Sequence, residues 1–234
     1  MQVLKKPMSD EIRQLIKETH KFRSKNATYH RLYEVEVFVK DPLPENIDLN
    51  NVFSFLNRRI PSYMLNLIDV VYIGQFDDFE DRGINAKYAD GALYVTNEQE
   101  NDEDMIDDMV HEVAHALEET YGQDIYEDGS IEREFLGKRT RLERILGYLE
   151  HDTESYNFEK TDYDLKFDFF LHREIGYDII EPLIIGLFVE PYAATSLREY
   201  FATGFEDYYL NNGEYIKTMS PALYKALDEL NNLE

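Results

Sequence analysis

The chain has 234 residues, 43% of them hydrophobic, which suits one large domain with a sizeable core. A formal net charge of −24 disfavours nucleic acids and anionic membrane surfaces as partners, because both would be repelled. The chain has no cysteine, so disulfides and thiolate metal sites are excluded and any zinc must be held by histidine and carboxylate side chains.

No secretory signal peptide is expected at the start of the sequence. Residues 1–8 are followed by Ser9 and two acidic residues rather than by the apolar region of a secretory signal peptide. No run approaches the roughly 18 apolar residues that a membrane-spanning helix needs. We therefore expect a protein of the cytoplasm, or of a particle assembled inside the cell, and the oligomeric state is not predicted.

The first half of the chain alternates helical and strand patterns. Apolar residues at helical spacing predict helices over residues 9–25 and 48–60, the second ended by Pro61. Alternating or continuous apolar runs predict strands over residues 32–39, 68–74 and 92–96. The last of these follows an Asp90-Gly91 turn and has two interpretations. It is either a plain hairpin strand or a sheet edge that pairs with an extended peptide substrate.

Residues 102–122 predict the helix around which the chain is organised. The helix begins with three acidic residues, whose negative charge interacts favourably with the positive end of the helix dipole. Gly122 is expected to end it. The sequence His111-Glu112-Val113-Ala114-His115 has the H-E-x-x-H pattern, which places two imidazoles one turn apart on one helical face. Such a pair can share one Zn²⁺, and Glu112 can act as general base on a water. The buried stripe is expected elsewhere on the helix, at Ile106, Val110, Val113 and Leu117.

The second half is predicted to be mostly helical. Helices are expected over residues 131–150, 172–189, 196–210 and 220–231, the second of them broken near Pro182, with residues 151–170 irregular. The first of these helices carries the densest basic cluster of the chain. Either the cluster binds an acidic partner, or it pairs internally, as Glu134 with Lys138 at i,i+4 would.

A catalytic zinc usually has three protein ligands, so a third ligand is needed besides His111 and His115. Glu118 lies about 10 Å along the helix axis from His111, which would strain a site built from one straight helix. Glu199 is the better candidate, although Ser196 and Glu199 also form an S-x-x-E capping box that alone explains a glutamate there. Glu206 shares the same helical face two turns later and is the alternative to test.

Two segments together resemble the catalytic domain of the anthrax lethal factor family and the related Pro-Pro endopeptidases of clostridia. The first segment is the H-E-x-x-H helix. The second begins with a tyrosine, which is followed after six residues by the sequence Glu-aromatic-Phe-Ala-x-x-Phe. The match covers residues 102–120 and 192–230. The resemblance implies a zincin-like fold, zinc ligands His111, His115 and Glu199, the general base Glu112, and Tyr192 as stabiliser of the oxyanion.

The chain departs from that family in two places. The segment between His115 and Glu199 is longer, and Thr203 replaces an acidic residue that the family pattern carries. We therefore expect an α+β protein with an N-terminal sheet-containing half over residues 1–122, a helical insertion over 123–190 and C-terminal helices over 191–234.

The function expected is that of a zinc metalloendopeptidase acting on an extended protein or peptide substrate. The alternative is a structural or interaction protein, such as a virion or assembly component, that retains a zincin fold. An intact Glu112 favours the enzyme, because a purely structural zinc site needs no base.

Overall fold

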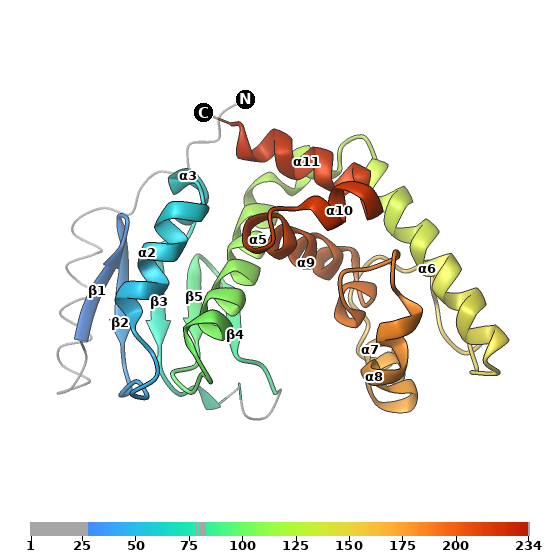
Figure 1. Ribbon diagram of the computed structural model, residues 1–234, viewed down its shortest axis with the longest axis horizontal. Helices are drawn as coiled ribbons and strands as arrows, with labels where there is room; N and C mark the ends of the chain where they lie inside the picture. Colours follow the sequence, from blue (N-terminus) through green and yellow to red (C-terminus); the bar gives the residue numbers. More distant parts are fainter. Residues whose placement is uncertain (1–27, 78, 80–82, 234) are drawn as a thin grey trace. The chain divides into compact units, whose positions relative to one another are not determined.

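The computed structural model describes residues 28–77, 79 and 83–233 (Figure 1). The helix expected over residues 9–25 lies outside these. The chain divides into two compact units, Met1–Thr120 and Tyr121–Glu234. The first unit contains the sheet and the second is helical.

The first unit is built on a mixed five-stranded sheet with the order β1-β2-β3-β5-β4 (Figure 1). The central pairs β2–β3 and β3–β5 are parallel, and the outer pairs β1–β2 and β4–β5 are antiparallel hairpins. The architecture is therefore α+β with a small mixed sheet. The strands are β1 (Thr28–Leu32), β2 (Val35–Val39), β3 (Val70–Ile73), β4 (Ala86–Ala89) and β5 (Ala92–Val95).

The strand expected over residues 32–39 is wrong in one respect, because the chain reverses inside it. Leu32 pairs with Val35 across a two-residue turn, and Tyr33 adopts a left-handed φ of 51°. The apolar alternation continues across this turn, so the sequence pattern looks like one strand. The strand predicted over residues 68–74 is confirmed as β3.

Strand β5 is interior to the sheet, paired with β3 on one side and β4 on the other. The hairpin interpretation of residues 92–96 is therefore correct, and their interpretation as a free substrate-binding edge is wrong. Asp90 and Gly91 form the turn, with φ values of 51° and 82°. The positive φ of Gly91 favours glycine there, and a Cβ would also lie 2.4 Å from Oδ2 of Asp69. The edge strand on this side of the sheet is β4, and β1 forms the other edge.

The core of the first unit follows from the strand register. Val37, Val71 and Leu93 are neighbours across three strands and are completely buried. Helix α2 (Leu49–Arg59) confirms the helix predicted over residues 48–60, and Asp48 caps it by accepting from the Asn50 amide. The short helix α3 (Ser62–Leu65) follows the predicted stop at Pro61.

Helix α5 (Asp102–Tyr126) begins as predicted but ends later. The Asn101 side chain accepts a hydrogen bond from the Asp104 amide and so caps the helix. Gly122 does not end it, contrary to expectation. The extra turn is stabilised by packing, since Ile125 is buried and the Tyr126 ring meets Phe201 edge-on at 6.3 Å.

The second unit consists of helices and short helical turns. The helices predicted over residues 131–150, 196–210 and 220–231 are confirmed as α6, α9 and α11. The helical stretch expected over 172–189, with a break near Pro182, is divided into short helical segments, and its first break is at Gly176, where φ is 99°. No helix in the part of the chain that the structure describes is both long and apolar enough to cross a membrane. The elements are α6 (Ser130–Tyr148), α7 (Leu165–Phe169), η1 (Phe170–Gly176), α8 (Tyr177–Ile180), η2 (Glu181–Leu183), η3 (Pro191–Ala194), α9 (Leu197–Leu210), α10 (Glu214–Met219) and α11 (Pro221–Asn231).

The basic cluster on α6 does not form one surface patch, because some of its side chains are buried and others are exposed. Lys138 is buried and donates to Ser220 Oγ at 2.6 Å. Glu134 accepts from the Tyr200 hydroxyl at 3.0 Å and from a backbone amide of α11 at 2.9 Å. Glu134 and Lys138 thus bond to neighbouring helices, which corrects the expectation that they pair chiefly with each other. The network joins α6 to α9 and α11.

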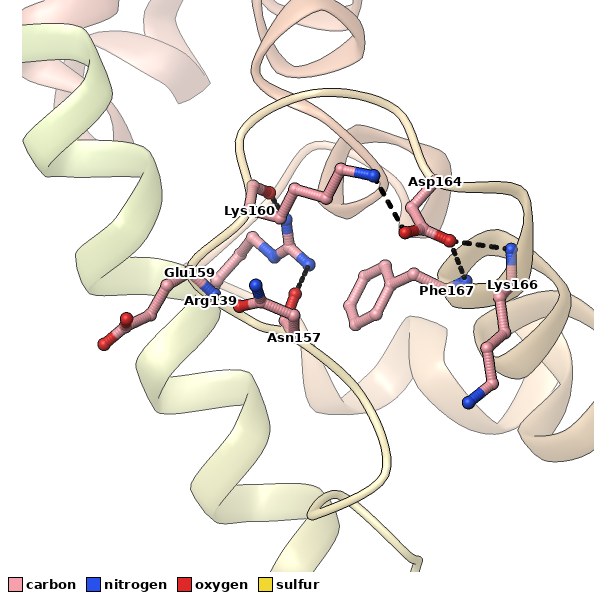
Figure 2. A network of polar contacts seen from close by, with 7 residues as sticks. All are labelled: Arg139, Asn157, Glu159, Lys160, Asp164, Lys166 and Phe167. Atoms are coloured by element: carbon pink, nitrogen blue, oxygen red, sulfur yellow. Dashed lines mark hydrogen bonds and ion pairs between the residues drawn. The ribbon is translucent and has the colours of Figure 1, made fainter.

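Arg139 connects α6 to the irregular segment that follows it through hydrogen bonds (Figure 2). Its guanidinium donates to the backbone carbonyls of Lys160 and of Asn157, the latter at 3.1 Å. The same group stacks over the Phe167 ring at 4.0 Å from the centroid. Asp164 caps α7 and also accepts from Lys160 Nζ at 2.9 Å. A buried cation on α6 therefore holds residues 157–167.

Candidate metal site on helix α5

His111, Glu112 and His115 form a group on α5 that could hold a metal ion. Each side chain offers one ligand atom, and these atoms all lie within 4.8 Å of one another. The two imidazole rings are 4.7 Å apart between centroids and nearly perpendicular, at 85°. This is the arrangement expected from histidines at i and i+4 on one helical face.

The apolar side of α5 holds this group in place. The predicted stripe of Ile106, Val110, Val113 and Leu117 is buried as expected. His111 is half-buried, whereas Glu112 and His115 keep only 8% and 6% of their surface exposed. Glu112 and His115 are therefore part of the buried core, whereas His111 is accessible to solvent.

Glu112 lies beside β4, one of the two edge strands of the sheet. Its Oε2 accepts a hydrogen bond of 2.5 Å from the backbone amide of Tyr88, a residue of β4. That amide points away from β5, because a β-strand amide directed at its partner strand could not reach α5. The contact fixes the carboxylate of Glu112 against the sheet and leaves Oε1 for other chemistry.

A second acidic group flanks the histidines one turn earlier on α5. Asp108 Oδ2 accepts a hydrogen bond of 2.7 Å from the Gln99 side chain. Burial raises the pKa of Asp108 to about 6, while the bond from Gln99 opposes the rise. Burial also raises the pKa of Asp107. Two carboxyl groups that hold their protons more readily than usual thus lie near His111.

Glu118 is not part of the three-residue group, but its carboxylate faces His115. Glu118 Oε2 lies 3.7 Å from His115 Nδ1, and both side chains are largely buried. From the sequence we did not expect Glu118 to bind the same metal as His111, and its position beside His115 is consistent with that expectation.

Tyr192 and Glu199 belong to the second unit. Tyr192 lies in η3 and is half-buried, and Glu199 lies in the first turn of α9 with 8% of its surface exposed. The Ser196 hydroxyl accepts from the Glu199 amide at 3.1 Å, so the serine half of the capping box is formed. Glu206, further along α9, is half-buried. The roles of Tyr192 and Glu199 at the metal site stay predictions.

Two groups at the site were not found from the sequence. The Tyr88 amide is a main-chain donor, which no side-chain pattern can reveal. Gln99 precedes α5 by only a few residues, but one glutamine in a polar stretch carries no specific signal. The missed strand β4, with the sequence Ala-Lys-Tyr-Ala, explains why the neighbour of Glu112 was not predicted.

No family model, curated protein or solved structure matches this chain. The likeness to the lethal factor family therefore rests on the motif residues themselves.

Proposed function

We propose that this protein is a zinc-dependent endopeptidase with a zincin-like fold, related to the lethal factor and Pro-Pro endopeptidase group. The observation that carries the proposal is the cluster of His111, Glu112 and His115 on one helix, with Glu112 bonded to the edge strand of a sheet. A glutamate so placed has a defined orientation next to two metal donors, which a structural site does not need.

The donor set fits zinc. Two imidazoles and carboxylates are ligands that zinc takes, and the chain has no thiolate to compete with them. Tetrahedral bonds of about 2.0 Å require donors about 3.3 Å apart. The donor atoms of His111 and His115 lie within 4.8 Å, so small side-chain rotations suffice. By the resemblance, Glu199 is the third ligand.

Zinc bound here would act as a Lewis acid that activates water and polarises the scissile carbonyl. Glu112 accepts the proton of the attacking water and passes it to the leaving amine. The Tyr88 amide holds Glu112 in the orientation that this transfer needs. By the resemblance, the Tyr192 hydroxyl donates to the oxyanion as negative charge develops there.

We assign the substrate, in an extended conformation, to the outer edge of β4, which pairs with no further strand among the described residues. Edge strands present unpaired amides and carbonyls that can pair with another chain. The outward amide of Tyr88 is taken by Glu112, so a peptide along Ala86–Ala89 would pair with the remaining outward groups of β4 and lie beside the proposed base. This assignment replaces the earlier one to residues 92–96, which are interior to the sheet.

Cleavage of an unbiased peptide mixture tests the proposal. The zinc-loaded full chain is incubated with the mixture, and mass spectrometry detects new termini, with Glu112→Gln as the comparison at equal zinc content. We expect cleavage by the wild type and a loss of at least about 100-fold in the variant. Equal cleavage by both proteins would remove Glu112 from the mechanism. Stoichiometric zinc without cleavage of any peptide would favour the alternative of a structural or interaction protein.

A further inference from the structure

The contact between Glu118 and His115 is the feature that extends the site beyond its motif. These residues lie at i and i+3 on α5, so their side chains share one helical face. Nδ1 of His115 and Oε2 of Glu118 are 3.7 Å apart, and only 8% and 13% of the two side chains are exposed. A carboxylate held this close in a largely buried place biases the imidazole electrostatically.

The contact makes the two ring nitrogens of His115 different, because the Glu118 carboxylate lies beside Nδ1. A neutral imidazole carries its proton on one nitrogen and a lone pair on the other. The carboxylate beside Nδ1 favours the proton on that nitrogen, which leaves the lone pair on Nε2. Nε2 is therefore the atom prepared to bind a metal. The separation is that of an ion pair, and a rotation of the Glu118 side chain would shorten it to a hydrogen bond.

We propose that Glu118 is a positioning residue that fixes the tautomer and ring orientation of His115 for metal binding. This inference rests on the proposed function, because it takes His115 as a zinc ligand. Carboxylates that accept from the second nitrogen of a ligating histidine orient the ring and strengthen it as a donor. The functional motif of α5 is then His111-Glu112-x-x-His115-x-x-Glu118.

The neighbouring Glu119 provides a matched control. It carries the same charge on the same helix but is exposed, and it interacts with the Tyr88 hydroxyl, whose pKa it raises together with burial. A general effect of negative charge on zinc affinity would be lost equally in Glu118→Gln and Glu119→Gln. An effect on His115 itself would be confined to Glu118→Gln.

The first measurement is the zinc dissociation constant of the full chain, by competition with a chromogenic chelator. Removing such a carboxylate typically weakens metal binding 10- to 100-fold. We expect a loss of at least about 10-fold in Glu118→Gln and less than about twofold in Glu119→Gln. Circular dichroism and the thermal midpoint establish that both variants are folded. Equal losses in the two variants would overturn the inference.

The second measurement uses the metal-free protein, so it holds even if zinc is not the cofactor. Nitrogen-15 chemical shifts of the His115 ring at pH 8 report which nitrogen is protonated. We expect the Nδ1–H tautomer in the wild type and in Glu119→Gln, and a shift toward Nε2–H in Glu118→Gln. A wild-type ring protonated on Nε2 would overturn the inference. Absence of peptide cleavage with this tautomer intact would instead count against the proposed function.

Discussion

The backbone amide of Tyr88 donates a hydrogen bond to Oε2 of Glu112, and this bond joins the edge strand β4 to helix α5. It places the glutamate of the H-E-x-x-H motif beside the outer edge of β4. A carboxylate that accepts from a fixed main-chain donor loses little further freedom when it accepts a proton from water. The sheet edge therefore takes part in orienting the proposed base.

Removing that amide should slow catalysis without removing the metal. Proline at position 88 lacks the N–H, and because the amide points away from β5 no bond of the hairpin is lost. Tyr88→Ala keeps the amide and loses the buried ring, so it is the control. We expect kcat to be about 10-fold lower in Tyr88→Pro than in Tyr88→Ala, at equal zinc content. Identical kcat values would show that the bond does not orient Glu112.

Glu199 can be tested separately from its capping role. Glutamine serves as well as glutamate at the third position of a capping box, but it is a poorer zinc ligand. We therefore expect Glu199→Gln to change the free energy of unfolding of the metal-free protein by less than about 0.5 kcal/mol, yet to weaken zinc binding at least tenfold. Isothermal titration with zinc measures the second effect. Weaker zinc binding in Glu206→Gln, with Glu199→Gln unaffected, would transfer the ligand role to Glu206.

Lys138 should give the second unit a pH-dependent stability. Burial lowers its pKa from 10.5 to about 8, with Glu134 opposing the shift. Below about pH 8 the folded chain bears the full cost of a buried ammonium. Between about pH 8 and pH 10.5 the unfolded chain binds more protons, so stability rises with pH.

The measurement is the difference in unfolding free energy between wild type and Lys138→Met, from urea titrations at several pH values. We expect this difference to shift in favour of the wild type by up to about 3 kcal/mol between pH 8 and pH 10.5. Lys217, which is exposed on α10, provides the control variant Lys217→Met. A difference that does not change with pH would mean that Lys138 titrates normally.

Arg139 should determine the order of the segment that follows α6. Replacing it with leucine leaves the carbonyls of Asn157 and Lys160 without its two hydrogen bonds and removes the stacking over Phe167. We expect a loss of about 3 kcal/mol in unfolding free energy and faster proteolysis within residues 151–164. Arg144→Leu, at an exposed position of α6, should change neither. Unchanged proteolysis in Arg139→Leu would contradict the fastening role.

The sequence was sufficient wherever a local signal and the packing agreed. Asp48 and Pro61 delimit α2 as predicted, and the stripe from Ile106 to Leu117 is buried. His111, Glu112 and His115 are neighbours because helical spacing alone makes them so.

The sequence was insufficient where long-range packing overrides a local signal. Gly122 normally favours the end of a helix, but the contact of Tyr126 with Phe201 extends α5 past it. Tyr33 turns the chain inside an unbroken apolar alternation, and the pairing partner of β5 depends on sheet order, which periodicity does not contain. The Tyr88 amide at Glu112 follows from that order, so it too was beyond prediction.

The central claim, an open zinc site on α5, is tested most directly by X-ray absorption spectroscopy of the zinc-loaded full chain. We predict one zinc per chain, with two imidazole nitrogens and oxygens from one carboxylate and one solvent molecule. The double variant His111→Ala, His115→Ala should hold no stoichiometric zinc. A closed site of four protein ligands, or stoichiometric zinc in the double variant, would contradict the account.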